Sequence, residues 1–382
     1  QQIVETTMSR LEAGHILEQC KLVKAAYFNL GLSQPNRLFI TIHHLAVDSI
    51  SWSILLQDIE TVYTQLVHGK SINLPAKTTS FKAWAEKLNE FAQTEALRRE
   101  LDYWIAVFKE VTSEIPIDIL VEAANTEMSA RTVSVSLSLE ETLSLLQDVP
   151  SVYNTQINDA LLTALAQTIT DWTGQTFLFI SLEGHGREEI IKNVDLSRTS
   201  GWFTTIFPTR LTLPDSPGAS AALKSIKEQL RGIPNRGIGF GLLRYLCQDG
   251  AVQAKLSTLP KPQILFNYLG QFDRALPDSA LFRFSRPLAG AHSPEALRSH
   301  LLEINMTVIS GCLRMNWTYS QNIHHRQTIQ QLADNYAEAL RTLIAHILSP
   351  DEAGGFTPSD FPLANLDEDK ISQITNILDE LE

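Results

Sequence analysis

Two adjacent histidines and an aspartate form the first group of side chains that could carry out chemistry. Residues 42–52 read IHHLAVDSISW, at the predicted end of a strand and start of a helix. Adjacent strand residues point to opposite sides, so only one of His43 and His44 can face a given cavity. A neutral imidazole is a common general base near pH 7, and Asp48 could orient it or tie the loop down. We take His44 as the candidate base and His43 as structural.

A metal site from His44 and Asp48 would need a third ligand, and none lies at a diagnostic spacing, so we predict no metal. A second histidine pair, His324 and His325, follows no predicted strand and precedes no carboxylate. We therefore predict that this second pair lies on the surface.

The second candidate group is LEGHGRE, residues 182–188, which follows a strand predicted to be buried on both faces. Two glycines around His185 predict a tight turn that exposes side chains at the strand end. Glu183 lies where the strand leaves the core, and Arg187 could hold its carboxylate ionised. The same pair could instead be a structural ion pair that closes the turn. The glycine spacing lacks the Lys-Ser/Thr ending of a phosphate loop.

Three further segments place polar residues inside apolar runs. They read DLSRTSGWFT at 195–204, PNRGIGFGLLRY at 234–245 and FNYLGQF at 266–272. Asn267 and Tyr268 close a predicted strand and carry donors that could reach a developing oxyanion. The glycines of the second segment follow a Pro-Asn turn rather than a strand, so we reject a dinucleotide fingerprint there.

The elements that must position these groups alternate between strands and helices along the chain. Apolar spacing predicts strands over 21–30, 37–43, 131–139, 176–182, 205–213, 263–268 and 302–317. It predicts helices over 51–67, 80–108 (one or two helices), from 140, and over 155–172, 221–231 and 329–348. This order predicts the α/β or α+β class with mixed sheets. The acidic stretch 366–382 has helical spacing and is expected to form a peripheral helix or a tether.

Composition excludes several classes of function. The 382 residues carry 43 acidic and 31 basic side chains, for a net charge of −12, which argues against nucleic acid as the main ligand. No apolar run approaches the roughly 18 residues of a membrane span, and the N-terminus does not resemble a signal peptide. Cys20, Cys247 and Cys312 are scattered and odd in number, which predicts reduced thiols and a cytoplasmic location.

The chain resembles the epimerization domains of nonribosomal peptide synthetases, relatives of condensation domains and of chloramphenicol acetyltransferase. HHLAVDSISW resembles the HHxxxDxxSW signature of that family, and EGHGRE resembles the motif that sets epimerization domains apart from condensation domains. The other three segments resemble further family blocks, in the expected order. Ser49 stands where the family usually has glycine. Only 42 residues precede His43 and the chain lacks an initial methionine, so we expect the first lobe to lack its first part.

The resemblance implies two chloramphenicol acetyltransferase-like lobes, each a mixed sheet with flanking helices, arranged as a V around a central tunnel. We expect the N-terminal lobe over 1–138, the C-terminal lobe over 139–365, and an acidic tail or linker helix over 366–382. On this hypothesis His44 and Glu183 would face each other across the tunnel.

The resemblance also implies a reaction, inversion of the Cα of an aminoacyl or peptidyl thioester from L to D without a cofactor. The substrate would arrive on the 4'-phosphopantetheine arm of an upstream peptidyl carrier domain within a synthetase. Proton removal gives an enolate, and inversion needs return of the proton on the opposite face. His44 and Glu183 are the candidate proton-transfer groups, with their order open. The supporting residues on this hypothesis are Asp48, His43, Arg187, Asn267, Tyr268, Ser51 and Trp52.

Other mechanisms and functions fit the sequence less well. The three cysteines form no obvious pair of the kind some racemases use, and no lysine marks a pyridoxal site. A condensation domain that forms a peptide bond is the first alternative, although it would not need Glu183. A noncatalytic domain that only docks carrier proteins is the second alternative.

Overall fold

The computed structural model describes residues 2–109, 111, 114–120, 124–215, 218–271, 282, 292–347, 354–364, 366–367, 370–371 and 373. The chain folds as two compact units. The first comprises Gln1–Lys87, Ile191–Thr204 and Arg274–Ser293, and the second comprises Leu88–Ile190, Thr205–Asp273 and Pro294–Glu382. The second unit thus includes residues 88–138, which we expected in the first lobe.

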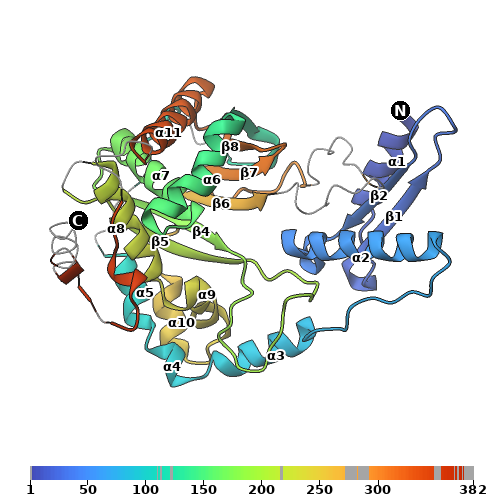
Figure 1. The fold of residues 1–382 in the computed structure, drawn as a ribbon, viewed down its shortest axis with the longest axis horizontal. Coiled ribbons are helices and arrows are strands. Elements are labelled where there is room, and N and C mark those ends of the chain that lie inside the picture. Colours follow the sequence, from blue (N-terminus) through green and yellow to red (C-terminus); the bar gives the residue numbers. More distant parts are fainter. Residues whose placement is uncertain are drawn as a thin grey trace, which may run out of the picture. The chain divides into compact units, whose positions relative to one another are not determined.

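The first unit contains a small sheet and two main helices (Figure 1). Helix α1 (Gln2–Ala13) precedes β1 (Val23–Phe28) and β2 (Arg37–Ile42), which pair antiparallel from Val23↔Ile42 to Phe28↔Arg37. Helix α2 (Ser49–Val67) follows, and α3 (Phe81–Phe91) begins in this unit. The two strands and the helix after them confirm the predictions for residues 21–67. The sheet here is purely antiparallel.

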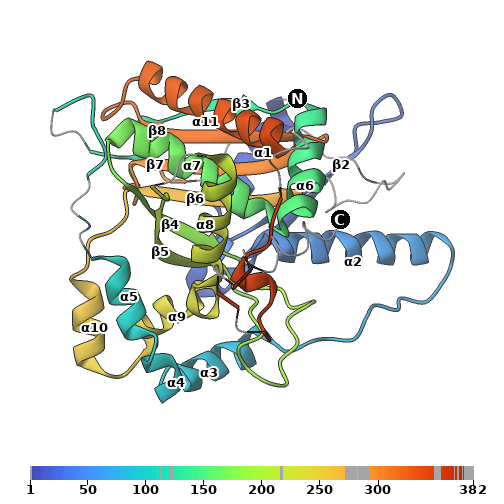
Figure 2. The same ribbon diagram turned by 60° about the vertical axis from the view of Figure 1, so that its left-hand side comes forward.

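The second unit is built on a six-stranded mixed sheet of order β3-β8-β7-β6-β4-β5 (Figure 2). β4 and β6 pair parallel, as do β6 and β7, and the other neighbours are antiparallel. This sheet confirms the predicted mixed α/β class. Its strands are β3 (Ala130–Ser136), β4 (Phe177–Gly184), β5 (Thr205–Thr212), β6 (Ile264–Gln271), β7 (Leu302–Ile309) and β8 (Cys312–Ser320).

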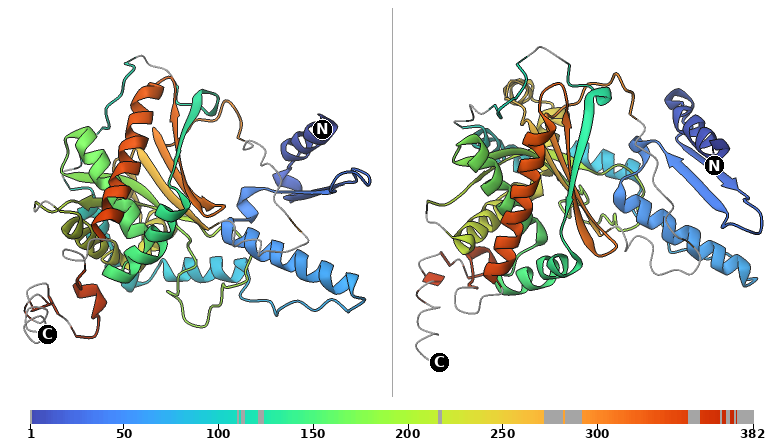
Figure 3. Two further views of the ribbon diagram at one scale, coloured as in Figure 1. Left: turned by 45° about the horizontal axis from the view of Figure 1, so that its top comes forward. Right: turned by 90° about the horizontal axis from the view of Figure 1, so that it is seen from above.

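Helices cover one face of this sheet, and α11 lies along β3 and β8 (Figure 3). Phe266, Ile304 and Trp317 are fully buried on that face. Because strand side chains alternate between faces, Asn267, Glu303 and their neighbours belong to the other face. The helices of this unit are α4 (Glu95–Arg98), α5 (Leu101–Val107), α6 (Leu139–Tyr153), α7 (Ile157–Thr173), α8 (Ala219–Arg231), α9 (Ile238–Gly241), α10 (Gly250–Ser257) and α11 (Arg326–Ile347).

Three sequence predictions need correction. The single strand expected over 302–317 is a hairpin, because Ser310 (φ 52°) and Gly311 (φ 74°) form a tight turn between β7 and β8. The region 80–108 forms three helical segments, α3, α4 and α5, rather than one or two. His324 is buried, with 1% of its surface exposed, and its Nε2 lies 3.0 Å from the Pro116 carbonyl, so only His325 of that pair is exposed.

Most of the acidic stretch 366–382 lies outside the described residues. Among the helices that the structure describes, none is both long and apolar enough to cross a membrane.

A buried ion pair fastens the segment before this stretch to the second unit. Lys227 of α8 is 1% exposed, and its Nζ donates to both Asp360 carboxylate oxygens at 2.6 and 2.7 Å and to the Tyr153 carbonyl at 3.0 Å. Asn154 also donates to Asp360, at 2.6 Å. A buried ammonium needs its carboxylate partner, because an unpaired buried charge costs several kcal/mol.

We predict that Asp360→Asn destabilises the protein by about 3–5 kcal/mol, because it leaves the Lys227 charge unpaired. The double variant Lys227→Met/Asp360→Asn removes both charges and is expected to lose less stability than Asp360→Asn. Urea unfolding measures both effects. A loss in Asp360→Asn no larger than in the double variant would contradict this role of the pair.

Candidate acid–base site

The histidine loop of the first unit lies between β2 and α2. Residues His44–Ala46 form one 3-10 turn after the strand ends. His43 precedes this turn, and its Nδ1 accepts a hydrogen bond from the Leu45 backbone N–H at 3.2 Å. That bond fixes the His43 ring within its own loop. The His44 side chain is exposed, and its ring lies edge-on to Trp202, with centroids 4.7 Å apart.

Asp48 anchors this loop to the 195–204 segment. It is 5% exposed and caps α2, because its Oδ1 accepts from the Ser51 N–H at 2.7 Å. Its Oδ2 accepts from the Phe203 N–H at 3.3 Å. The Ser51 hydroxyl donates to the Gly201 carbonyl at 3.0 Å and accepts from the Gly201 N–H at 3.1 Å. The HHLAVDSISW and DLSRTSGWFT segments therefore form one structure, which places Trp202 against His44.

Trp52 is half-buried in the first turn of α2, and its backbone N–H donates to the Asp48 carbonyl at 3.1 Å. Gly201 is required by packing, since a Cβ there would overlap the Phe81 ring. Ser51 and Trp52 thus belong to the framework of the loop, and His44 is the histidine of the pair whose ring is exposed.

Glu183 lies at the end of β4 in the second unit, on the sheet face opposite the helices α7 and α11. On β4 this face carries Phe177 and Phe179, the second of which Phe108 covers at a ring separation of 5.5 Å, and becomes polar at Ser181 and Glu183. Burial raises the pKa of Glu183 to about 7, and the negative charge of Glu303 adds to the shift. A carboxyl with this pKa can both donate and accept a proton near neutral pH.

We expected Arg187 to hold Glu183 ionised, and this expectation is wrong. The pKa of Glu183 is raised rather than lowered, and its causes are burial and Glu303. An arginine paired with this carboxylate would shift the pKa downward.

The turn after β4 is held by other residues of the EGHGRE segment. His185 Nδ1 accepts from the Arg187 backbone N–H at 3.0 Å, and Nε2 lies 3.4 Å from the Glu188 carboxylate. The other oxygen of buried Glu188 lies 3.7 Å from Nε of Arg236. These contacts connect the EGHGRE turn to the 234–241 segment.

The 234–241 segment is built over a buried carboxyl that our sequence reasoning missed. Glu100 accepts from Trp104 Nε1 at 3.0 Å and from Asn235 Nδ2 at 2.5 Å, and burial raises its pKa. A Cβ on Gly239 would overlap this carboxylate, which explains the glycine. Asn235 and Arg236 have φ of 45° and 50°, so the segment holds Arg236 in a backbone conformation that only a fixed loop maintains.

Asn267 and Tyr268 lie on β6, where both are half-buried. Ser181↔Leu265 and Leu182↔Phe266 are paired in parallel, and Glu183 and Asn267 directly follow the last pair. Asn267 therefore shares the polar face with Glu183. Alternation places Tyr268 on the opposite face at that position, just before an irregularity between Tyr268 and Gln271. Of the two expected cavity residues, Asn267 is the one on the Glu183 face.

A charged cluster lies beside Glu183 on the same face. Glu303 of β7 is paired with Arg298 at 3.1 Å, and the Arg298 side chain has no exposed surface. His300 Nε2 lies 2.9 Å from the Ser181 hydroxyl, and burial together with Arg298 and Lys261 lowers the His300 pKa to about 4. His300 is thus neutral near pH 7. Alternation of polar and apolar residues in 302–309 and 312–320 was the signal that could have identified this polar face.

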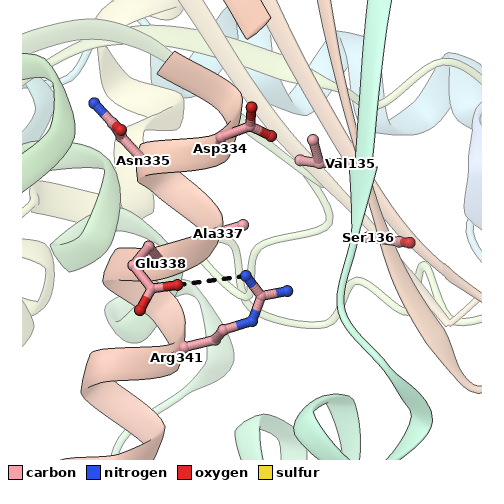
Figure 4. A pocket seen from close by; sticks show the side chains of 7 residues that line it. All are labelled: Val135, Ser136, Asp334, Asn335, Ala337, Glu338 and Arg341. Atoms are coloured by element: carbon pink, nitrogen blue, oxygen red, sulfur yellow. Dashed lines mark ion pairs between the residues drawn. The ribbon is translucent and has the colours of Figure 1, made fainter. Parts of the chain in front are cut away.

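The structure also contains a hollow of about 550 Å³ between β3 and α11 (Figure 4). None of the expected site residues lines it. The Arg341 guanidinium in this hollow forms ion pairs with Glu141 at 2.7 Å and with Glu338 at 3.5 Å. Among the described side chains, no group of three or more His, Cys, Asp or Glu is arranged to hold a metal ion.

Comparison with known proteins gives the family. The family model of the condensation domain matches residues 1–360. The chain belongs to the condensation-domain family. This condensation-family chain is 48% identical, over 96% of its length, to a subunit of linear gramicidin synthase from Brevibacillus parabrevis. It is 37% identical, over 98% of its length, to surfactin synthase subunit 1 of Bacillus subtilis (strain 168). It covers 5% and 10% of those two relatives, respectively.

Solved structures agree with this family assignment. The crystal structure of the epimerization domain from the third module of tyrocidine synthetase B matches with a TM-score of 0.82 and 37% identity, covering 90% of this chain and 76% of that one. The X-domain from teicoplanin biosynthesis matches with a TM-score of 0.60 and 19% identity, covering 87% of this chain and 73% of that one, which shows a common fold. The condensation-family fold is therefore established for this chain.

The raised pKa of Glu183 predicts a pH-dependent stability difference that needs no substrate. The folded state holds this proton more tightly than the unfolded state, whose carboxyl titrates near 4.5, so wild-type stability falls as pH rises from about 4.5 to about 7. The side chain introduced by Glu183→Gln is neutral at every pH, so this variant does not lose stability over this pH range. The melting temperature of this variant relative to wild type should therefore rise between pH 5 and pH 8. The rise should be about 2–4 °C for each kcal/mol of difference in the free energy of unfolding.

Glu189→Gln, at an exposed position directly after the EGHGRE segment, is the matched control and should show no such trend. A melting-temperature difference for Glu183→Gln that stays constant across this pH range would contradict the raised pKa.

Proposed function

We propose that this chain epimerises the Cα of an aminoacyl or peptidyl thioester held on the phosphopantetheine arm of a carrier protein. The 37% identity to an epimerization domain, over 90% of this chain, supports this function. The relatives named above are synthetase subunits, which supports a carrier-bound substrate.

Glu183 is the strongest support for this proposal. Proton removal next to a thioester needs a base whose pKa is close to working pH, and an ordinary exposed glutamate near 4.5 is a weak base. Burial at the end of β4 brings the Glu183 pKa to about 7. When it accepts the Cα proton, this carboxyl becomes neutral and loses the unfavourable buried charge. Glu183 can then act as base in one direction and as acid in the other.

His44 is the proposed second proton-transfer group. Its ring is exposed, is packed edge-on against Trp202, and is carried on a loop that buried Asp48 anchors. A fixed imidazole can deliver a proton or stabilise the negative charge of an enolate. Inversion requires that the proton leave from one face of Cα and return to the other, so two such groups suffice for the reaction.

Hydrogen-bond donors near Glu183 stabilise the enolate in this mechanism. The enolate oxygen carries negative charge, and neutral donors held in a poorly hydrated site stabilise it. Asn267 lies on the Glu183 face and is the nearest neutral donor along β6. Asp48 and Ser51 act as positioning residues for the His44 loop.

The test is uptake of deuterium at Cα from heavy water by an aminoacyl substrate loaded on a carrier protein. We expect Glu183→Gln and His44→Ala each to lower exchange by about 10²-fold or more, the usual contribution of a general acid or base. Glu189→Gln and His325→Ala, both at exposed positions, are the matched controls and should retain wild-type exchange.

Wild-type exchange in both Glu183→Gln and His44→Ala would contradict this assignment. Dipeptide formation with an added acceptor aminoacyl carrier, without Cα exchange, would show a condensation domain instead. Binding of the loaded carrier with neither reaction would show a docking domain.

A further inference from the structure

Three asparagines lie side by side across the sheet next to Glu183. Asn267 of β6 is in register with Asn305 of β7, which is in register with Asn316 of β8. Asn316 in turn pairs with Ser134 of β3. Because paired residues point to the same side of a sheet, we call Asn267, Asn305 and Asn316 the asparagine row of the Glu183 face. Neither Asn305 nor Asn316 was singled out from the sequence.

The amides of this row are largely uncommitted. Within the described part of the chain, the side chains of Asn267 and Asn305 have no hydrogen-bond partner, and Asn316 uses only its Oδ1, which accepts from the Ser134 hydroxyl at 2.7 Å. All three residues are half-buried. Half-buried amides without partners are costly unless water or a ligand satisfies them. On the same face, the hydroxyls of Thr132 and Thr318 do have a partner, each other, at 3.0 Å.

The functional groups of the asparagine row indicate which class of ligand it binds. A carboxamide offers one acceptor and two donors and carries no charge, so it matches the N–H and C=O groups of another peptide better than it matches a carboxylate or a phosphate. We infer that the asparagine row binds the backbone amides of a peptidyl chain, so that the substrate is a peptidyl thioester rather than a single aminoacyl thioester. This inference rests on the proposed epimerase function and specifies its substrate class.

The dimensions of the row agree with a peptide of several residues. From Glu183 on β4 to Asn316 on β8 the face extends about 14 Å, in three steps of about 4.8 Å. An extended peptide advances about 3.3–3.6 Å per residue, so about four residues span this distance. A single aminoacyl group whose Cα lies at Glu183 extends only about as far as the neighbouring strand.

The charges on the face also disfavour a free aminoacyl group. Its α-ammonium would need a carboxylate partner besides the proton-transfer group. Among the described residues, Glu303 is a second carboxylate on this face, and it is already paired with Arg298 at 3.1 Å. A peptidyl substrate has an amide at that position and needs no such partner.

The experiment compares two substrates on one carrier protein, an aminoacyl and a tetrapeptidyl thioester with the same C-terminal residue. Asn305→Leu and Asn316→Leu should each lower kcat/KM for Cα exchange of the peptidyl substrate by about three- to tenfold, the effect of one lost hydrogen bond, and change the aminoacyl value by less than about twofold. Thr132→Val, on the same face but outside the row, is the matched control for both substrates.

Calorimetry with unreactive pantetheine amides of the same two acyl groups separates binding from chemistry. Asn305→Leu should weaken binding of the tetrapeptidyl amide and leave that of the aminoacyl amide unchanged. If wild type exchanges neither thioester but this difference in binding persists, the epimerase proposal fails and the peptide site stands. Equal effects on the two acyl groups, or no effect on either in exchange and binding, would overturn the inference.

Discussion

The carboxyl of Glu183 is held where its charge is poorly solvated, and much of the second unit maintains that position. β4 is buried from Phe177 to Leu182, and its last two residues, Glu183 and Gly184, are half-buried where the strand leaves the core. The Phe179 and Phe108 rings cover the face before Glu183, and Glu303 places a second negative charge beside it. Burial and like charge act in the same direction, and together they give a carboxyl that titrates near neutral pH.

The alternation of strand side chains connects stability and function in this sheet. One face of β6, β7 and β8 carries fully buried apolar residues such as Phe266, Ile304 and Trp317, which form the core with the helices. The other face carries the asparagine row and Glu303. A shift of register by one residue would exchange the faces, so the core packing that stabilises the unit also fixes which polar groups lie beside Glu183.

The sequence predicted the parts of this arrangement that depend on residues close together along the chain. Apolar spacing located most helices and strands, and the EGHGRE segment identified Glu183 as a side chain at a strand end. Local patterns could not show that the Glu183 pKa depends on Glu303, which is 120 positions away along the chain. They could not show that Glu100 supports the 234–241 segment, since that contact depends on tertiary packing. The hairpin at Ser310–Gly311 was missed because polar and apolar residues alternate on both sides of the turn.

The ionisation of Glu183 controls proton transfer at Cα in the proposed reaction. The most direct measurement is the pH dependence of Cα deuterium exchange in wild type and in Glu303→Gln. The wild-type profile should contain an ionisation with a midpoint of about 7, and removal of the Glu303 charge should move that midpoint to lower pH. A midpoint that stays in place in Glu303→Gln, or a wild-type profile without an ionisation near 7, would contradict this role of Glu183.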